Sequence, residues 1–254
     1  MSDARHDASA DAPDESRQQV ALACRALVHA GVLNGTLGHV SVRAGEGRAW
    51  VRCRGPEERG LRFTSAGDVH AVGLDGTPPD DDRYRAPHEL PIHTAVMRRR
   101  PEVNAVVHAH PNFALLVGLA DLSLEPLFGA YNIPAMQLAA DGVAVYPRAV
   151  LINDDRLAAE FVTSLGDSQV ALLRGHGIVT TGASLEAAVI AAVNLEELCR
   201  VTVELHRLGV RPAAINAEDR TQLPDLGRRF NDAQAYRNLV AEVLAAELES
   251  GRAR

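Results

Sequence analysis

The residues best suited to chemistry in this chain are His108 and His110, which flank one alanine at the end of the apolar run 103–109. Side chains two residues apart on a strand point to the same side of the sheet, so both imidazoles are expected to face one site. Two imidazoles on one face suit a divalent transition metal. Taken alone, the pair is explained equally well by packing or hydrogen bonding of the two rings.

Two further residues can complete a metal site with this pair. His176 stands between two glycines directly after the apolar run 170–173, where the backbone can turn sharply and leave the imidazole at a strand end. Glu89 lies at the expected start of a helix, although the helix dipole alone also favours a carboxylate there. Three histidines and one carboxylate can form a catalytic metal site that leaves room for a substrate.

The composition limits which chemistry is available. All 26 basic residues are arginine, and the lack of lysine excludes a lysine Schiff base, lysine-anchored pyridoxal phosphate and the lysine of a phosphate loop. The 33 acidic residues bring the net charge to -7, which argues against a nucleic-acid partner. The three cysteines have no paired spacing, so reduced thiols and a cytoplasmic location are expected. No apolar stretch is long enough to predict a membrane span.

The pattern of apolar residues predicts the elements that would hold these groups. Residues 1–14 are expected to form a disordered polar tail, and residues 15–254 one domain that ends in a helical extension. A first helix over 15–29 precedes extended runs typical of an antiparallel meander, at 37–42, 50–52, 61–64 and 69–72. Later helices are expected at 90–100, 112–119, 154–165, 184–208 and 226–248, and buried strands at 103–109, 170–173 and 178–180. Residues 121–153 are rich in Gly and Pro and give no clear pattern.

Four motifs along the chain form a pattern that is far more specific than any one of them. They are Gly35-Thr-Leu-Gly-His-Val-Ser-Val-Arg43, Glu89-Leu-Pro-Ile-His93, Arg100-Pro-Glu-Val-Asn-Ala-Val-Val-His-Ala-His-Pro111 and Leu173-Arg-Gly-His-Gly177. In this order, over roughly residues 15–208, they resemble the class II aldolase/adducin family. The resemblance implies a three-layer αβα fold around a mainly antiparallel sheet. It also implies a homotetramer with its active sites between subunits.

The resemblance further implies roles for individual residues. His108, His110 and His176 would be the metal ligands, and Glu89 a catalytic carboxylate that can also bind the metal. Zinc, manganese, iron and cobalt all suit such a ligand set, and affinity alone does not select among them. The implied cofactor is therefore a divalent transition metal.

Two motif variants separate this chain from the sugar-phosphate aldolases and epimerases of that family. Those enzymes typically have Gly-Asn where this chain has Gly-His at 38–39, and Ser-Ser where it has Pro-His at 87–88. Proline offers neither a hydroxyl nor a backbone amide to a phosphate. Thr64 and Ser65 keep part of another anion-binding loop in altered form. The variants resemble instead the branch of the family that decarboxylates aromatic dicarboxylates such as dihydroxyphthalate.

The resulting hypothesis is a metal-dependent carbon–carbon lyase that decarboxylates a small, non-phosphorylated, hydroxylated aromatic carboxylate. Retro-aldol cleavage and decarboxylation both leave a carbanion, which a metal can stabilise as a Lewis acid. Either Glu89 or His88 is expected to deliver the proton that replaces carbon dioxide. His93, four residues after Glu89 on one helix face, is expected to orient that carboxylate.

Further contacts with the substrate are expected from His39, Arg43, Thr64 and Ser65. His39 and Arg43 are candidates to bind the second carboxylate, Arg43 through a bidentate fork, although a surface charge at a strand end explains this arginine equally well. Tyr131 is a weaker candidate for an acid contributed across a subunit interface.

Two other functions stay open at this point. One is an aldolase or epimerase that acts on a sugar or sugar phosphate. The other is a non-catalytic, adducin-like oligomerisation module, which would have no need to keep Glu89 and all three histidines.

Overall fold

A computed structural model describes residues 8–45, 47–227 and 229–251 of the chain. The strands within these residues are β1 (His39–Arg43), β2 (Arg48–Arg52), β3 (Val69–Gly73), β4 (Ala105–Ala109), β5 (Ala144–Tyr146), β6 (Val170–Leu173) and β7 (Gly177–Gly182). They form a seven-stranded sheet in the order β3-β2-β1-β4-β7-β6-β5. Every neighbouring pair is antiparallel except β5 and β6, which are parallel.

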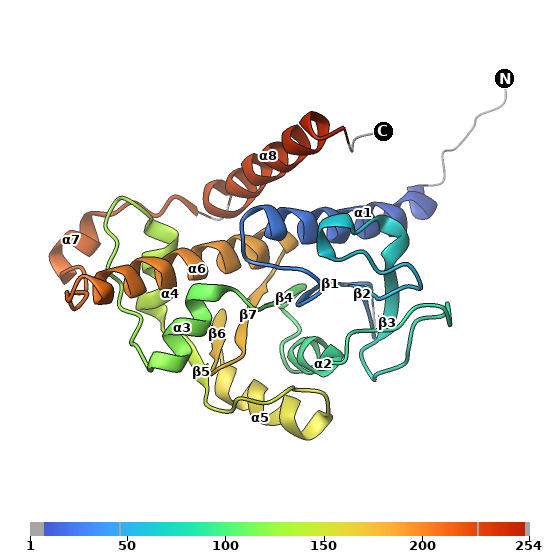
Figure 1. Ribbon diagram of the computed structural model, residues 1–254, viewed down its shortest axis with the longest axis horizontal. Helices are drawn as coiled ribbons and strands as arrows, with labels where there is room; N and C mark the ends of the chain where they lie inside the picture. The colour runs from blue at the N-terminus through green and yellow to red at the C-terminus, as the bar shows by residue number, and fades with distance from the viewer. Residues whose placement is uncertain (1–7, 46, 228, 252–254) are drawn as a thin grey trace.

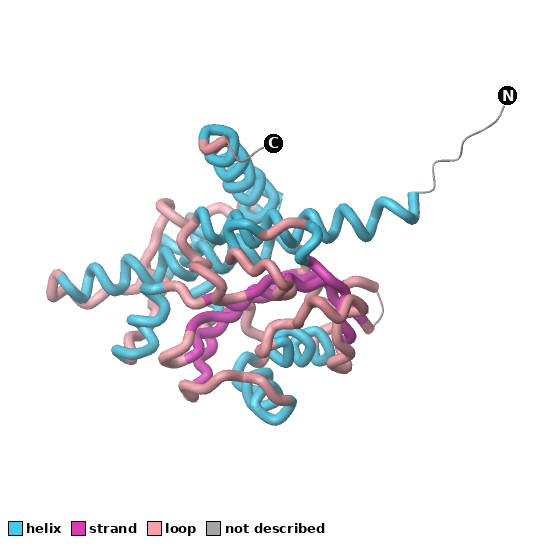
Figure 2. Tube along the Cα trace, turned by 45° about the vertical axis from the view of Figure 1, so that its right-hand side comes forward, coloured by secondary structure: helices cyan, strands magenta, loops and turns pink. Residues whose placement is uncertain are grey.

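Helices cover both faces of this sheet. One face packs against α1 (Ala8–His29), α3 (Asn112–Ala120) and α6 (Leu185–Arg207), and α8 (Ala235–Glu249) joins this layer by packing on α1 and α6. The other face packs against α2 (Leu90–Arg99) and α5 (Asp155–Leu165) (Figure 1). In Figure 2 the strands run as one band between these two helical layers. The predicted three-layer αβα fold around a mainly antiparallel sheet is therefore confirmed.

Two helices lie outside this simple layering. The α4 helix (Ile133–Asp141) packs on α6 through a small apolar cluster that includes Ile133, Met136 and Leu198. The short α7 helix (Ala217–Gln222) precedes a π-helical turn at Arg229–Gln234 that leads into α8. Neither α4, β5 nor α7 was predicted, because residues 121–153 and 209–225 carry little apolar periodicity.

Alternation along β4 decides which way the predicted metal ligands face. Val107 and Ala109 join the apolar cluster beneath α1 and α6, whereas Val106 joins the cluster beneath α2 and α5. His108 follows Val106 by two residues and therefore lies on the α2 face. The side chain of His108 therefore faces the helical layer that contains α2.

Several element boundaries differ from those predicted. The α1 helix begins at Ala8, so residues 8–14 are helical rather than a disordered tail, and residues 1–7 of that tail lie outside the described residues. Residues 61–64 are not a strand: Leu61–Phe63 form a 3-10 turn whose first amide donates to the carbonyl of Gly35. The last helix, α8, starts at Ala235 rather than near residue 226. The Ser184 side chain caps α6 as expected, by accepting from the amide of Ala187 at 3.3 Å.

Candidate metal centre

Four side chains from three separate segments converge on the α2 face of β4. Glu89 is the residue before α2, His108 belongs to β4, His110 follows that strand, and His176 lies in the turn between β6 and β7. One candidate ligand atom from each of them lies within 4.8 Å of the others. Glu89 and His108 are buried, while His110 and His176 are partly buried. The structure thus brings the four predicted ligands together.

Two glycines allow the neighbouring strands and loops to approach β4 at this point. A Cβ atom on Gly177 would lie 2.1 Å from the carbonyl oxygen of Ala109. A Cβ atom on Gly38 would lie 2.7 Å from the carbonyl oxygen of His108, and the φ angle there is 99°. A larger residue at either position would push the neighbouring backbone away from β4, which carries His108 and leads to His110.

Hydrogen bonding fixes which nitrogen of His108 carries the proton. Its Nδ1 donates to the carbonyl oxygen of Ile178 at 2.9 Å, so Nε2 of the neutral ring has only a lone pair. That Nε2 lies 3.1 Å from Glu89 Oε2 and 2.9 Å from His110 Nε2. A carboxylate oxygen and a bare nitrogen repel each other in a buried site unless a cation lies between them. The residues present therefore fit a divalent metal.

The Glu89 carboxylate is held toward this cluster from its other side. Its Oε1 accepts from the amide of Ile152 at 3.1 Å and lies 3.4 Å from His176 Nε2. Although Glu89 occupies the N-cap position of α2, its side chain makes no capping hydrogen bond there. The Nδ1 atom of His176 is buried without a hydrogen-bond partner among the described residues. The carboxylate is thus oriented for the cluster rather than for its own helix.

The electrostatics of the cluster favour the ionisation states that bind metal. Burial, together with the neighbouring imidazoles of His108 and His176, lowers the pKa of His110 to about 3. Burial raises the pKa of Glu89, but the imidazoles of His108 and His176 beside it outweigh burial and hold that pKa well below its ordinary value. At neutral pH the carboxylate is ionised and the His110 imidazole is neutral, as metal coordination requires.

Two further candidates, His88 and Arg43, lie in different surroundings. His88 precedes buried Glu89 in the chain, and its side chain is exposed. Arg43 stands at the far end of β1, about 13 Å along the strand from His39. Its Nη2 donates to the carbonyls of Met97 and Val103. His88 is thus linked to the cluster by its place next to Glu89 in the chain, whereas Arg43 ties β1 to the end of α2.

His93 does not orient Glu89, in contrast to the prediction. Its Nδ1 lies 2.6 Å from the hydroxyl of Ser41 and its Nε2 lies 3.1 Å from Nδ1 of His39, so both ring nitrogens are occupied. Burial lowers the pKa of His93 to about 3, and burial likewise holds the pKa of His39 well below its ordinary value. Ser41 was not singled out from the sequence, although its position two residues after His39 on one strand face is a signal that could have revealed it.

Thr64 and Ser65 belong to the loop 61–68, where their polar groups already have partners. The Thr64 hydroxyl donates to the carbonyl of Leu61 at 2.9 Å. The amide and hydroxyl of Ser65 both donate to Oδ2 of Asp68, at 2.8 and 2.9 Å. Arg25 donates to the carbonyl of Thr64, which holds the loop against α1. The structure does not bring these two residues into the metal cluster.

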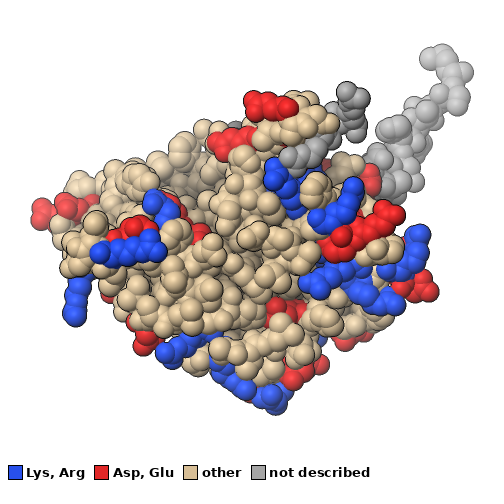
Figure 3. All heavy atoms as spheres, viewed as in Figure 1, with Lys and Arg blue, Asp and Glu red and all other residues tan. Residues whose placement is uncertain are grey.

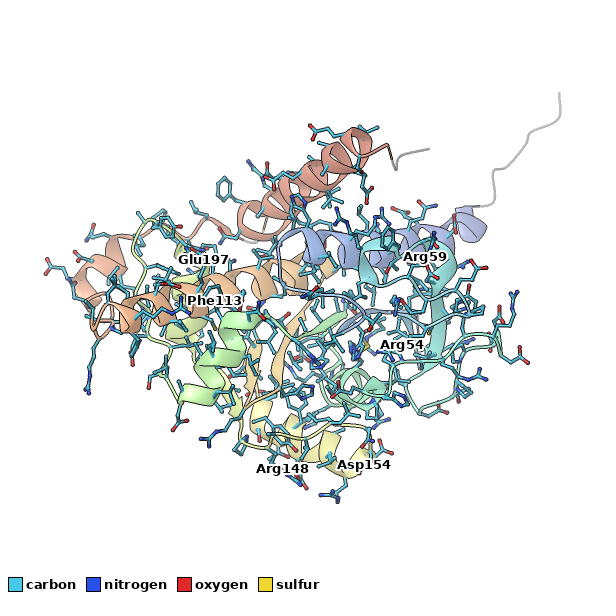
Figure 4. All side chains as sticks on the ribbon, viewed as in Figure 1. Arg54, Arg59, Phe113, Arg148, Asp154 and Glu197 are labelled. Atoms are coloured by element: carbon cyan, nitrogen blue, oxygen red, sulfur yellow. The ribbon has the colours of Figure 1, made fainter. Side chains whose placement is uncertain are left out.

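The helix that follows His110 is anchored by an acidic residue that the sequence did not reveal. Glu196 on α6 accepts from the amides of Phe113 and Ala114 at 2.9 Å each, and Figure 4 shows Phe113 at the start of α3. Tyr131 is 75% exposed and its hydroxyl donates to Glu197, which Figure 4 places on α6. Within one chain, Tyr131 is therefore not part of the metal cluster.

The surface and the helices also bear on possible partners. On the face shown in Figure 3, acidic and basic side chains are interspersed around the rim and do not form a basic stripe. Among the helices of the described residues, none combines the length and the apolar character needed to cross a bilayer.

The family described as "Class II Aldolase and Adducin N-terminal domain" matches residues 18–203, so the chain belongs to the class II aldolase/adducin family. An aldolase II superfamily protein from Pseudomonas syringae has the same fold, with a TM-score of 0.78 and 21% identity over 92% of this chain and 93% of that one. An L-fuculose 1-phosphate aldolase from Glaciozyma antarctica has a TM-score of 0.75 and 18% identity over 98% of this chain and 96% of its own.

Sequence relatives point to a particular branch of this family. The 3,4-dihydroxyphthalate decarboxylase of Arthrobacter keyseri is 46% identical over 235 residues, which cover 91% of this chain and 95% of the relative. That of Rhodococcus jostii is 40% identical and covers 89% of this chain and 95% of its own length. The L-fuculose phosphate aldolase of Haemophilus influenzae is more distant, at 27% identity over 80% of this chain and 89% of its own. The predictions of a lyase of this family, and of closer resemblance to its decarboxylases, are confirmed.

Proposed function

We propose that this chain is a metal-dependent decarboxylase of 3,4-dihydroxyphthalate or a closely similar hydroxylated aromatic dicarboxylate. The observation that carries the proposal is the complete set of Glu89, His108, His110 and His176, converging in a chain with decarboxylase relatives at 40% and 46% identity. The Gly-His and Pro-His variants at 38–39 and 87–88 support a substrate without a phosphate.

The three histidines and Glu89 would hold one divalent ion, which we propose to be zinc, manganese, iron or cobalt. When bound, this ion supplies Lewis-acid stabilisation of the negative charge that develops as carbon dioxide leaves. The chain contributes the charge of Glu89 and the neutral His110 ring, and it holds both in place through Ile152 and the neighbouring strands.

The remaining step is a proton transfer. The bond between the ring carbon and the carboxylate carbon breaks, the electron pair stays on the ring carbon, and carbon dioxide departs. A proton must then reach that carbon. We assign this transfer to His88, because its exposed ring can exchange protons with water, whereas Glu89 is only 4% exposed and faces three histidines.

Incubation of metal-loaded protein with 3,4-dihydroxyphthalate tests the proposal directly. Loss of the carboxylate beside the 3-hydroxyl leaves 3,4-dihydroxybenzoate, so chromatography and carbon dioxide release should report equal amounts of product. The variant His88→Asn should keep the metal and lose at least about 100-fold in kcat, in the range typical of a general acid. Turnover of a sugar phosphate without carbon dioxide release would establish the aldolase alternative instead, and metal-free, inactive protein would favour the oligomerisation module.

We also propose that the protein is a cytoplasmic homotetramer with its active sites near subunit interfaces. Two exposed apolar side chains beside the cluster support such an interface. Leu119 is 60% exposed and would contact a Cβ on Gly175, next to His176, while Leu151 is 49% exposed and precedes Ile152. Sedimentation equilibrium tests this assembly, and a monomer that decarboxylates at the full rate would contradict it.

A further inference from the structure

A buried row of three side chains lies beside the metal cluster and is not part of it. Ser41 and His39 come from β1 and His93 from α2, with exposed fractions of 0%, 7% and 0%. The Ser41 hydroxyl oxygen lies 2.6 Å from His93 Nδ1, and His93 Nε2 lies 3.1 Å from His39 Nδ1. His39 is the β1 partner of His108 on β4, and the two ring centroids are 5.1 Å apart. The row therefore ends next to a metal ligand.

One assignment of donors and acceptors satisfies every hydrogen bond in this row. Each neutral imidazole has one N–H and one bare nitrogen, whereas a hydroxyl can donate and accept. If His93 Nδ1 carried its proton, Ser41 would accept, and the buried hydroxyl proton would have no acceptor among the described residues. Such an unpaired donor is unfavourable. Ser41 therefore donates to His93 Nδ1, and His93 Nε2 donates to His39 Nδ1.

This direction leaves the proton of His39 on Nε2, an atom without a hydrogen-bond partner among the described residues. We propose that Ser41 and His93 are positioning residues that hold His39 as an Nε2–H donor for the carboxylate that a dicarboxylate substrate retains. The inference deepens the proposed function and rests on it for the substrate class. An N–H group attracts a carboxylate, whereas a bare nitrogen at the same place would repel it.

Two ligands that are not turned over isolate the role of the retained carboxylate. The expected product, 3,4-dihydroxybenzoate, has this group, and 1,2-dihydroxybenzene lacks it while keeping both hydroxyls. In the variant Ser41→Ala, the tautomer of His39 is no longer fixed. Calorimetry on metal-loaded protein should show binding of 3,4-dihydroxybenzoate weakened in proportion to the lost Nε2–H population, about tenfold when that form falls to about one ring in ten. Binding of 1,2-dihydroxybenzene should change by less than about twofold.

The matched control is Thr202→Val, which also removes one buried hydroxyl. Thr202 lies in α6, where its Oγ1 donates to the carbonyl of Leu198 at 2.8 Å, outside the metal cluster. This variant should bind both ligands as the unchanged protein does. Equal weakening of both ligands by Ser41→Ala would show a general structural effect and overturn the inference.

The tautomer itself can be observed independently of any ligand. Nitrogen NMR of histidine-labelled, metal-loaded protein distinguishes an Nε2–H ring from an Nδ1–H ring, and His39→Asn identifies the signals that belong to His39. We expect the Nε2–H form in the unchanged protein and a mixture of both forms in Ser41→Ala. An Nδ1–H ring in the unchanged protein would refute the proposed direction.

Substitutions of His93 separate its hydrogen bond from its volume. The amide of His93→Gln can still donate to His39, so its KM for 3,4-dihydroxyphthalate should lie within about threefold of the original, whereas His93→Leu should raise KM about tenfold at nearly constant kcat. If His93→Leu does not fold, Ser41→Ala carries the test.

The inference and the proposed function can fail separately. If the protein binds 3,4-dihydroxybenzoate with His39 in the Nε2–H form but releases no carbon dioxide, the role of the row stands and the proposed function is refuted. Full decarboxylation with unchanged KM in Ser41→Ala would refute the row alone.

Discussion

The metal centre and the loop 61–68 were both expected to contact substrate, yet their polar groups are arranged in opposite ways. In the centre, ligand atoms from four residues face a common position within 4.8 Å of one another. In the loop, Asp68 accepts both hydrogen bonds of Ser65, and the Thr64 hydroxyl donates within the loop. Arg17 and Arg25 donate to carbonyls of residues 64–69.

The difference shows how a binding site can be told from a structural turn of similar composition. A polar group that is already paired inside the protein gains little from a ligand, whereas a buried unpaired group gains much. The lone pairs of His108 Nε2 and Glu89 Oε2 face each other at 3.1 Å and need a cation. The polar side chains of Thr64 and Ser65 need no ligand, because hydrogen bonds within the loop already pair them. Substitutions in the two regions should therefore have different consequences.

The largest effect is expected for Glu89→Gln, which keeps the shape of the side chain and removes its charge. The variant should lose bound metal, and its decarboxylation rate should fall at least about 1,000-fold, since a metal contributes several kcal/mol of charge stabilisation. Elemental analysis and steady-state kinetics measure both effects. His206→Asn is a suitable control, because His206 bonds the carbonyl of Thr202 on α6. Full metal content in Glu89→Gln would contradict the assignment of this ligand.

Acid should destabilise the folded protein through buried histidines in and beside the metal centre, and the sign follows from their lowered pKa values. His93 and His110 take up a proton near pH 3 in the folded protein but near 6.5 in the unfolded chain. The unfolded chain therefore binds more protons as the pH falls below 6.5, and the free energy of unfolding decreases there. Between pH 6.5 and 5 the decrease is at most about 2 kcal/mol for each such histidine.

Urea unfolding of chelator-treated protein at several pH values measures this decrease. The variant His93→Gln should flatten the dependence between pH 6.5 and 5, because one of the buried histidines with a lowered pKa is gone. A free energy of unfolding that is constant over this range would show that the buried histidines titrate normally.

Alanine substitutions of two glycines compare the regions through their packing. Gly177→Ala would bring its Cβ against the carbonyl oxygen of Ala109, whereas the nearest atom to a Cβ on Gly67 is Ser65 Oγ at 3.4 Å. Gly177→Ala should lower the free energy of unfolding by about 1–3 kcal/mol and weaken metal binding. Gly67→Ala should stay within about 0.5 kcal/mol of the original. Equal free energies of unfolding for the two variants would contradict this prediction and show that β7 can move away from β4 without a loss of stability.

The sequence predicts the metal centre better than its surroundings, for a physical reason. The ligands His108 and His110 follow from the two-residue period of a strand, and His176 from a glycine-flanked turn, which are local properties. The partner of His93 is not local. Helical spacing predicted Glu89 as that partner. In the structure the amide of Ile152 binds the Glu89 carboxylate at the cluster, and the His93 ring contacts His39 of β1 instead.

The same distinction explains the misassigned elements. Residues 61–64 have strand-like composition, yet a hydrogen bond from Leu61 to Gly35 and one from Arg25 of α1 to the carbonyl of Thr64 hold them as a turn. An arginine such as Arg43 is a typical anion-binding residue, yet carbonyls near the end of α2 accept from its Nη2. These outcomes depend on contacts between distant segments, which propensity and spacing do not encode.

The smallest effect is expected for Ser65→Ala in the loop. The substitution removes a hydroxyl that donates to Asp68 at the surface, while the amide of residue 65 still donates to the same carboxylate. The free energy of unfolding should fall by about 0.5–1 kcal/mol, and KM for 3,4-dihydroxyphthalate should change by less than about twofold. Urea unfolding and steady-state kinetics measure the two quantities on the same preparation. A tenfold rise in KM without loss of stability would mean that this hydroxyl turns from Asp68 to the substrate, and the loop would then belong to the binding site as the sequence predicted.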